Sequence, residues 1–384
     1  MSSRQFYIVL AISVIAMKMQ KLPCLVAGEL GKDAWILFIV YTLINLVAIL
    51  LVFIIFKRVD PKTVLKPAKN IFFNILRIIL MTATLLYFLV QAVLVYEHVQ
   101  ALFSNTLFDD LSWPFFSLLL LFTVFFLAHR GLENIALNYE LYTWIIVVPL
   151  VLLAIFGASQ TNFSEILPFE TICVGEIFSK LRMFSCWFGD FFLILYLGVK
   201  ARDSKLSKTL LVYSLSMLFV TFLVIVFTGM YGVVASTAPG LISVISEQSL
   251  LDMSIGRLDW FLILFTEMGA ILTCSIYLYF ANLCLHSIFP KANAFYLKFF
   301  NIAVLYILDI FILVDLNAKL RFFCGFMCDV SIIVGAFTML VLLGLAIFNN
   351  KNNAKNLDDN NLNFGKKRGG HNKRISHKTR EVKP

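Results

Sequence analysis

Apolar runs long enough to cross a membrane recur along this chain of 384 residues. Hydrophobic residues make up 60% of the sequence and charged residues 14%, whereas a soluble domain is about 45–50% apolar and about 25% charged. A helix needs about 20 apolar residues to cross a bilayer. Long apolar runs, in place of short alternating segments, favour helices over a β-barrel. The sequence therefore predicts an all-α polytopic membrane protein.

About ten transmembrane helices are expected, and the N-terminal run is interpreted as the first retained span because no signal-peptide cleavage site follows it. The ten predicted spans are 6–28, 35–56, 72–101, 112–130, 141–160, 183–200, 207–236, 259–285, 295–316 and 325–348. The third, seventh and eighth exceed membrane thickness, so we expect them to tilt or to run past the interface.

Charges in the loops predict the orientation of the chain. Lysine and arginine gather in 57–70, in 200–208 and in the C-terminal tail, while the alternate loops, such as 161–182, are acidic or mixed. Because basic loops stay on the cytoplasmic side, both termini are expected there. The expected division is a transmembrane permease-like domain, 1–348, and a basic, disordered cytoplasmic tail, 349–384, that contacts lipid and not nucleic acid.

The first predicted span is broken in its middle. Lys18, Met19, Gln20 and Lys21 interrupt the apolar run, and Pro23 follows. A lysine near the bilayer midplane costs about 2.5–3.5 kcal/mol, and a proline removes a backbone donor from the helix. Interrupted spans of this kind indicate a transporter-type binding site. The alternative is a short first helix from which Lys21 reaches the outer surface.

The sixth predicted span also carries a charge. Asp190 directly follows Gly189, and glycine permits a helix break. In a five-plus-five inverted-repeat arrangement, the sixth span is the inverted partner of the first. We therefore expect Lys18 and Asp190 to form an ion pair that lowers the cost of burying either charge. The alternative is that Asp190 lies nearer the surface and is solvated.

The residues at these two interruptions, Lys18, Met19, Gln20, Gly189 and Asp190, are candidate ligand-binding residues, and two further spans carry others. Glu267 follows Thr266 in the eighth span, where the carboxylate could bind a substrate amine, carry a proton or simply hydrogen-bond to a neighbouring helix. Tyr87 and Gln91 in the third span lie four residues apart and share a helix face. They either line a cavity or join helices through polar contacts.

Motifs for catalysis and metal binding are missing from the sequence. We find no P-loop, G-x-G-x-x-G, H-E-x-x-H or G-x-S-x-G motif. The seven cysteines show no C-x-x-C or Cys/His spacing. No enzyme activity, cofactor or metal is expected.

Several short motifs, in this order along residues 5–348, resemble the spore germination permease family, the B-type membrane subunit of germinant receptors. The motifs are Leu22-Pro23 with Asp33-Ala34-Trp35, Ser112-Trp113-Pro114, Arg130-Gly131-Leu132-Glu133 with Glu140, Ile166-Leu167-Pro168, Phe188-Gly189-Asp190 and Gly256-Arg257-Leu258-Asp259. The family is part of the amino acid–polyamine–organocation transporter superfamily.

The resemblance implies ten helices with a pocket between spans one, three, six and eight. It also implies an amino acid or similar small germinant, an A-type membrane subunit and a C-type lipoprotein as partners, and the spore inner membrane as location. The chain departs from the family where Lys18 and Gln20 replace a glycine-rich break, where Gly256 replaces an acid and where Thr266 replaces a tryptophan. These departures bear on ligand identity.

Three functions are compatible with these observations. The first is a germinant-receptor subunit that binds a small molecule near the midplane and signals to its partners. The second is a proton-coupled amino acid permease with Glu267 or Asp190 as proton carrier. The third is a scaffold with a vestigial pocket.

Overall fold

The structure is a computed structural model, and it describes residues 1–57, 71–106, 113–162, 174–200, 205–231, 258–313, 328–341 and 344. Every regular element in these residues is a helix. Six described segments are long and apolar enough to cross a membrane: Leu22–Phe56, Asn74–Gln100, Leu132–Gln160, Ser179–Lys200, Leu206–Tyr231 and Ile263–Ile288. The prediction of an all-α polytopic membrane protein is thereby confirmed.

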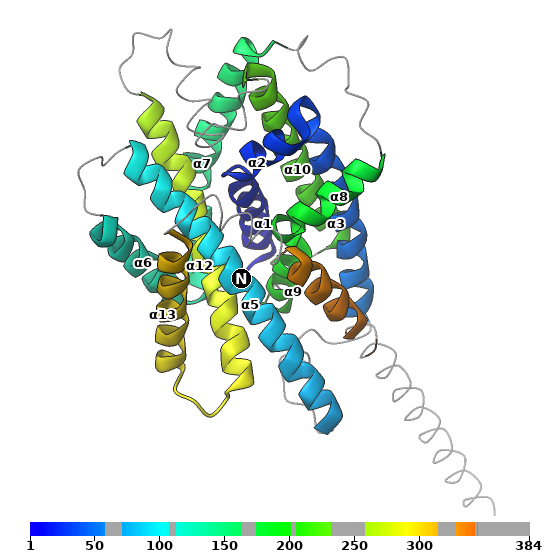
Figure 1. The fold of residues 1–384 in the computed structure, drawn as a ribbon. Helices are drawn as coiled ribbons and strands as arrows, with labels where there is room; N and C mark the ends of the chain where they lie inside the picture. The colour runs from blue at the N-terminus through cyan, green and yellow to red at the C-terminus, as the bar shows by residue number, and fades with distance from the viewer. Residues whose placement is uncertain are drawn as a thin grey trace, which may run out of the picture.

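Each of the ten predicted spans contains at least one helix (Figure 1). In chain order the elements are α1 (Ser3–Lys18), α2 (Leu22–Leu30), η1 (Gly31–Asp33), α3 (Ala34–Phe56), α5 (Ile71–Thr106), α6 (Trp113–Arg130), α7 (Leu132–Gln160), α8 (Val174–Phe184), η3 (Ser185–Phe188), α9 (Asp190–Lys200), α10 (Leu206–Tyr231), α12 (Leu258–Ile288), α13 (Ala294–Leu313) and the helix Cys328–Val341. The first and sixth spans are each built from two α-helices with a break between them. The tail 349–384 lies outside the described residues.

One helix was not anticipated. The segment 161–182 reads as a loop because it carries three glutamates and a proline, yet α8 occupies its second half. The apolar residues of Val174–Phe184 recur at helical spacing, which favours an amphipathic helix in spite of the charges. The prediction of a loop, which was based on the charges of this segment, is therefore wrong for its second half.

Helix α1 lies in the interior of the bundle, where it contacts α7, α9, α10 and α12. Ser2 caps its N-terminus, since the Ser2 hydroxyl accepts a hydrogen bond from the backbone N–H of Gln5 while the Gln5 side chain accepts one from the backbone N–H of Ser2. The long helices α5 and α12 pack side by side (Figure 1). This arrangement surrounds the end of α1 with neighbouring helices.

The outer surface of the bundle is apolar. Leu43 and Val47 on α3, Leu141 and Trp144 on α7, and Phe122 on α6 are all exposed. Some polar side chains in the same helices are buried, among them Asn45 on α3, Ser117 on α6 and Tyr139 on α7, as expected for a protein whose solvent is lipid. The apolar exterior therefore agrees with a position in the membrane.

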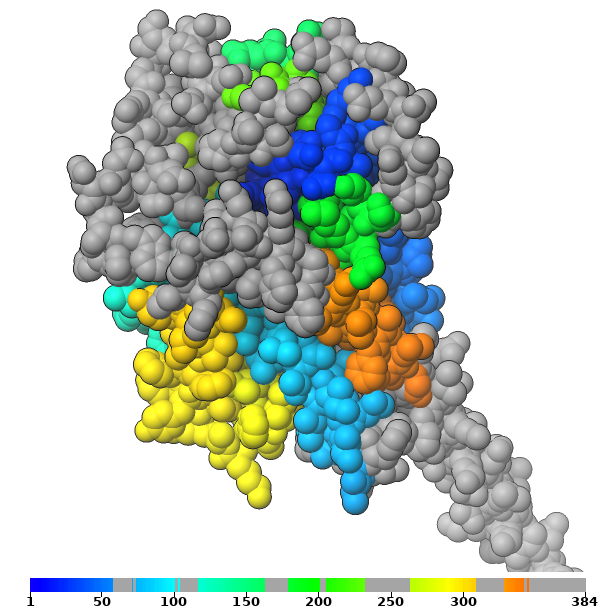
Figure 2. Space-filling view, in the orientation of Figure 1, coloured from blue at the N-terminus to red at the C-terminus, as the bar shows by residue number. Residues whose placement is uncertain are grey.

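Figure 2 shows one face on which segments distant in sequence lie next to one another. The α2–α3 region (blue), the end of α8 (green) and the helix Cys328–Val341 (orange) follow one another down this face. Ion pairs join them, because Lys180 bonds to Glu29 and Arg182 bonds to Asp329. The break in the sixth span is thus anchored to two other parts of the chain.

Candidate functional site

The first break separates α1 from α2. Helix α1 ends at Lys18, and α2 begins at Leu22 with Pro23 in its first turn. A proline at this position cannot donate the hydrogen bond that would continue one helix into the next. Met19, Gln20 and Lys21 therefore form a non-helical connection in the interior of the bundle, as the interrupted apolar run predicted.

The second break separates α8 from α9. The short helix η3 and Gly189 connect them, and α9 begins at Asp190. A Cβ atom on Gly189 would collide with the phenol oxygen of Tyr87. Glycine is required here because the backbone of the break approaches α5 so closely.

An ion pair joins the two breaks. Nζ of Lys18 lies 2.6 Å from Oδ1 of Asp190, and the Tyr213 hydroxyl donates to Oδ2 at 2.9 Å. Lys18 is fully buried and Asp190 is 4% exposed. The predicted Lys18–Asp190 pair is confirmed, and the alternative of a solvated Asp190 is wrong.

The helix dipoles favour the same arrangement. Lys18 is in the last turn of α1, where the partial charge of a helix is negative, and Asp190 is in the first turn of α9, where it is positive. Each side chain is thus compensated both by its partner and by its own helix end. If the first and sixth spans were continuous helices, no helix end would lie beside either charge.

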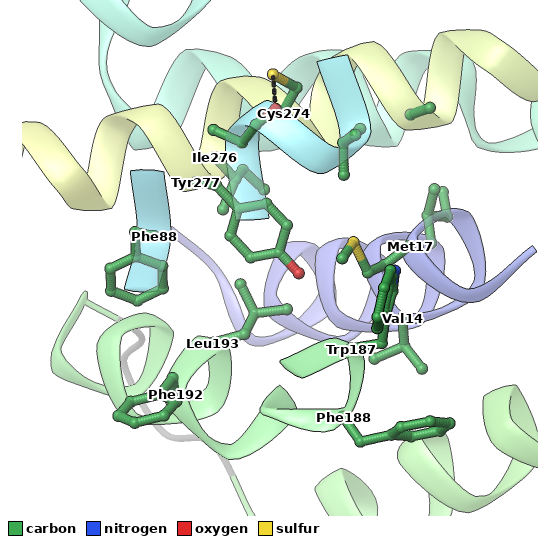
Figure 3. Close-up of a cluster of buried hydrophobic side chains, with 14 of the residues drawn as sticks. Val14, Met17, Phe88, Trp187, Phe188, Phe192, Leu193, Cys274, Ile276 and Tyr277 are labelled. Atoms are coloured by element: carbon green, nitrogen blue, oxygen red, sulfur yellow. Dashed lines mark hydrogen bonds between the residues drawn. The ribbon is translucent and has the colours of Figure 1, made fainter. Parts of the chain in front are cut away.

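Buried, mainly hydrophobic side chains pack around the two breaks (Figure 3). Met17 of α1, Trp187 of η3 and Tyr277 of α12 converge on the same space, although they come from three distant parts of the sequence. All three are at most 6% exposed. The ring of Phe188 lies 5.3 Å from Nζ of Lys18, which adds a cation–π contact. The two charges are thus buried inside the bundle.

Gln91 connects α5 to the short helix η3. Its Nε2 donates to the backbone carbonyl of Cys186 at 2.7 Å. That carbonyl belongs to η3, where the helical hydrogen-bond ladder is interrupted. Of the two expected roles, the contact between helices is the one observed.

A cavity lies on another side of α1, between α1, α7 and α12. Its lining residues are Ile12, Ile15, Ala16, Met19, Ile146, Leu150, Thr266, Glu267 and Ala270. The empty space is about 270 Å³ when its open part is included, but the interior has room for only about one water molecule. Three of the predicted ligand-binding residues, Met19, Thr266 and Glu267, belong to this lining.

The other predicted ligand-binding residues lie elsewhere. Lys18 and Asp190 bond to each other, Tyr87 and Gly189 are in close contact, and Gln91 bonds to η3. Gln20 is buried beside Met19, and its Nε2 has no hydrogen-bond partner in the described residues.

The position of the cavity differs from the one expected. The family resemblance implied a pocket among spans one, three, six and eight, whereas this cavity lies among spans one, five and eight.

Glu267 is the ionisable residue of the cavity lining. Its side chain is 1% exposed, its Oε1 lies 4.0 Å from Nε2 of His98, and its Oε2 has no hydrogen-bond partner in the described part of the chain. Thr266 donates its hydroxyl to the carbonyl of Ile263 at 2.8 Å. The cavity therefore combines apolar walls with one incompletely paired carboxylate.

Sequence reasoning missed a chain of hydroxyl groups that ties these helices together. Tyr139 of α7 lies 2.9 Å from the Ser13 hydroxyl of α1 and 2.9 Å from the Thr273 hydroxyl of α12. Its members are far apart in sequence and form no motif. Tyr139 lies just before the predicted span 141–160, so no feature of an apolar run pointed to it.

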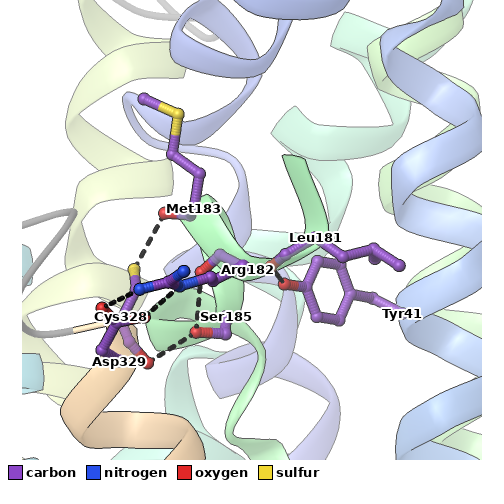
Figure 4. A network of polar contacts seen from close by, with 7 residues as sticks. All are labelled: Tyr41, Leu181, Arg182, Met183, Ser185, Cys328 and Asp329. Atoms are coloured by element: carbon purple, nitrogen blue, oxygen red, sulfur yellow. Dashed lines mark hydrogen bonds and ion pairs between the residues drawn. The ribbon is translucent and has the colours of Figure 1, made fainter. Parts of the chain in front are cut away.

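The second break is held at the α8 side by a polar network (Figure 4). Arg182 donates from Nε and a terminal nitrogen to the two carboxylate oxygens of Asp329, both at 2.6 Å. The Ser185 hydroxyl donates to the carbonyl of Cys328 at 2.8 Å, and the Tyr41 hydroxyl donates to the carbonyl of Leu181. The end of α8 is thereby fixed to α3 and to the helix Cys328–Val341.

Two broken spans joined by a buried ion pair, inside a bundle with an apolar exterior, define a multi-pass membrane protein of the transporter or receptor type. The family model described as spore germination protein matches residues 1–317. The chain belongs to this spore germination family, as the sequence motifs indicated. A search of curated proteins found no match.

Proposed function

We propose that the protein is the membrane subunit of a germinant receptor and binds a small germinant, such as an amino acid, in the cavity beside the first break. Family membership supports a role in germination. The observation that carries the proposal is the buried, incompletely paired Glu267 in an apolar cavity that the broken segment also lines. Such a combination of apolar walls and one polar group is typical of small-molecule sites.

The cavity is too narrow for an amino acid in this state, so entry of a ligand requires α1 to move relative to α7 and α12. A ligand that fits only the wider arrangement would shift the population toward it. In our proposal an A-type membrane subunit and a C-type lipoprotein in the spore inner membrane read out this shift. The termini and the tail lie on the cytoplasmic side, as the basic loops indicate.

A germination assay tests this proposal. Spores lacking the protein are compared with wild-type spores against a panel of amino acids, sugars and ions. We expect the deletion to abolish the response to a subset of small molecules and to spare the others. An unchanged response to every compound would contradict the proposal.

A second candidate is a proton-coupled amino acid permease, which Glu267 supports because a buried carboxylate can carry a proton. Uptake of labelled amino acids into vesicles, driven by a proton gradient and abolished by Glu267→Gln, would favour this candidate. Absence of uptake together with a germination defect would favour the receptor.

A further inference from the structure

We propose that Cys186 and Cys328 form a redox modification site. A peroxide converts the two thiols to a disulfide, and the disulfide locks the second break to the helix Cys328–Val341. Formation of the disulfide does not depend on the proposed function, whereas the effect of the lock on germination rests on it.

The first argument is that the two thiols meet. Cys186 belongs to η3 and Cys328 begins the last described helix, and their side chains hydrogen-bond to each other. Both cysteines are reduced and at most 2% exposed. A disulfide forms without strain only where the backbone already brings two sulfurs together. The contact between these thiols provides that arrangement.

The second argument is that the backbone around the pair is fixed (Figure 4). The Ser185 hydroxyl donates to the carbonyl of Cys328 at 2.8 Å, and the Cys328 thiol donates to the carbonyl of Met183 at 2.9 Å. Arg182 donates two hydrogen bonds to Asp329, the residue that follows Cys328. These bonds join the two segments at several points, so the thiols are held together without a search through other conformations.

The third argument is the environment of the Cys186 sulfur. Nε2 of Gln91 lies 3.4 Å from this sulfur and donates to it, in addition to its bond to the Cys186 carbonyl. A donor beside a sulfur stabilises the thiolate, which is the form that attacks a peroxide. The Cys274 thiol, by contrast, donates its own hydrogen to the carbonyl of Ala92.

The reaction balances with one peroxide molecule. The Cys186 sulfur attacks an oxygen of hydrogen peroxide, the O–O bond breaks, and the thiol proton leaves with the second oxygen as water. The Cys328 sulfur then attacks the resulting sulfenic acid, the S–S bond forms, and the S–O bond breaks with release of a second water. Two thiols are oxidised to one disulfide, and the peroxide is reduced to two water molecules.

The disulfide acts on the break that holds α1. Asp190 lies at the end of the same break, and its Oδ1 is 2.6 Å from Nζ of Lys18 at the end of α1. In the reduced protein, the link from this break to the last helix includes an Arg182–Asp329 pair that water weakens. A covalent bond cannot release in that way. It ties the break, and α1 through the ion pair, against the movement that ligand entry requires.

Peptide mapping tests the disulfide. The full chain in lipid nanodiscs is reduced, freed of reductant and treated with hydrogen peroxide or with copper phenanthroline, an oxidant that dissolves in the bilayer. Remaining thiols are alkylated, and the digest is analysed by mass spectrometry. We expect a linked pair of peptides that contains Cys186 and Cys328 and that dithiothreitol separates. Full alkylation of both cysteines after both treatments, or a disulfide from Cys186 to another cysteine, would overturn the proposal.

Cysteine variants locate the reaction. Cys328→Ala removes the second sulfur, so we expect Cys186 to stop at the sulfenic acid, which dimedone traps. Cys274→Ala is the matched control, because Cys274 is also buried but bonds to a backbone carbonyl, and it should keep the linked peptides. If Cys328→Ala fails to fold, the peptide map of the unaltered chain still decides. Absence of trapping in a folded Cys328→Ala protein would overturn the assignment of Cys186 as the attacking sulfur.

A germination assay tests the lock. Spores are treated with peroxide and then given a germinant to which the deletion strain does not respond. We expect the unaltered strain to lose its response and to regain it with dithiothreitol, and the Cys328→Ala strain to keep its response throughout. A disulfide that forms without loss of the response would overturn the lock. Unchanged germination on deletion, with the disulfide present, would overturn the receptor role and sustain the modification site.

Discussion

At the scale of single residues, three of the buried charged side chains differ in how they are compensated. Lys18 and Asp190 compensate each other at 2.6 Å, while Glu267 keeps one oxygen without a partner in the described residues. A paired charge holds helices together, whereas an incompletely paired one is available to a ligand. Buried ionisable side chains therefore serve two purposes in this protein: one pair holds helices together, and Glu267 is available to a ligand.

We expect Lys18→Met and Asp190→Asn to be more harmful singly than together. Each single change leaves one charge buried without its partner, which should lower the free energy of unfolding by about 3–5 kcal/mol. The double variant removes both charges and should recover a large part of this loss. Thermal unfolding in detergent gives the free energies of unfolding of the wild type, the two single variants and the double variant. Strictly additive losses would contradict the ion pair as a stabilising unit.

Gly189→Ala should destabilise the protein through steric overlap with Tyr87. We expect a loss of about 1–3 kcal/mol, the usual cost of overpacking an interior. Tyr87→Leu shortens the opposing side chain, so the double variant Gly189→Ala/Tyr87→Leu should lose less than the sum of its parts. The same unfolding measurement checks this coupling, and its absence would mean that another contact limits residue 189.

For the nine residues predicted to bind ligand, the sequence placed the spans, but the Lys18–Asp190 pair is the one contact that it predicted. Lys18 and Asp190 were identifiable because charges in apolar runs are rare and demand compensation. His98 and Tyr139 were not identified, since each gains its importance only from a neighbour on another helix. Periodicity along one helix says nothing about which helix faces it.

At the scale of elements, the breaks in the first and sixth spans were predicted and the helix α8 was missed. Pro23 and Gly189 break helices for local reasons that are visible in sequence. The helical spacing of the apolar residues in α8 is visible in sequence too, but the charges of the segment were given more weight. The tertiary structure adds what the sequence does not show, namely that Lys180 and Arg182 of α8 bond to the distant carboxylates of Glu29 and Asp329.

The Arg182–Asp329 pair should contribute far less to the free energy of unfolding than the buried Lys18–Asp190 pair. The two side chains are 70% and 37% exposed, so water screens their attraction. A double-mutant cycle of Arg182→Gln and Asp329→Asn should give a coupling energy below about 1 kcal/mol. A coupling comparable to that of Lys18 and Asp190 would show that this end of α8 is shielded from water in the membrane.

At the scale of the whole molecule, the division into domain and tail remains a prediction. We expect a chain truncated after residue 348 to keep its free energy of unfolding within about 0.5 kcal/mol, because the tail has too few apolar residues to contribute to the bundle. The truncated chain should also lose attraction for anionic lipid, at about 1 kcal/mol per basic residue near the surface. Unfolding curves and lipid-binding assays compare it with the full chain, and a marked loss of stability would show that the tail packs on the bundle.

The sequence by itself determined that this chain is a helical membrane protein of the spore germination family with two broken spans. Hydrophobicity, proline, glycine and isolated charges act locally, so their consequences can be deduced along the chain. The Lys18–Asp190 pair was expected from the sequence and is confirmed by the structure. Only the tertiary structure decided that Gln91 supports η3 and that Glu267 lines a cavity with α7. Pairing and cavity formation depend on which helices pack together, and this is set by contacts between residues more than 90 positions apart.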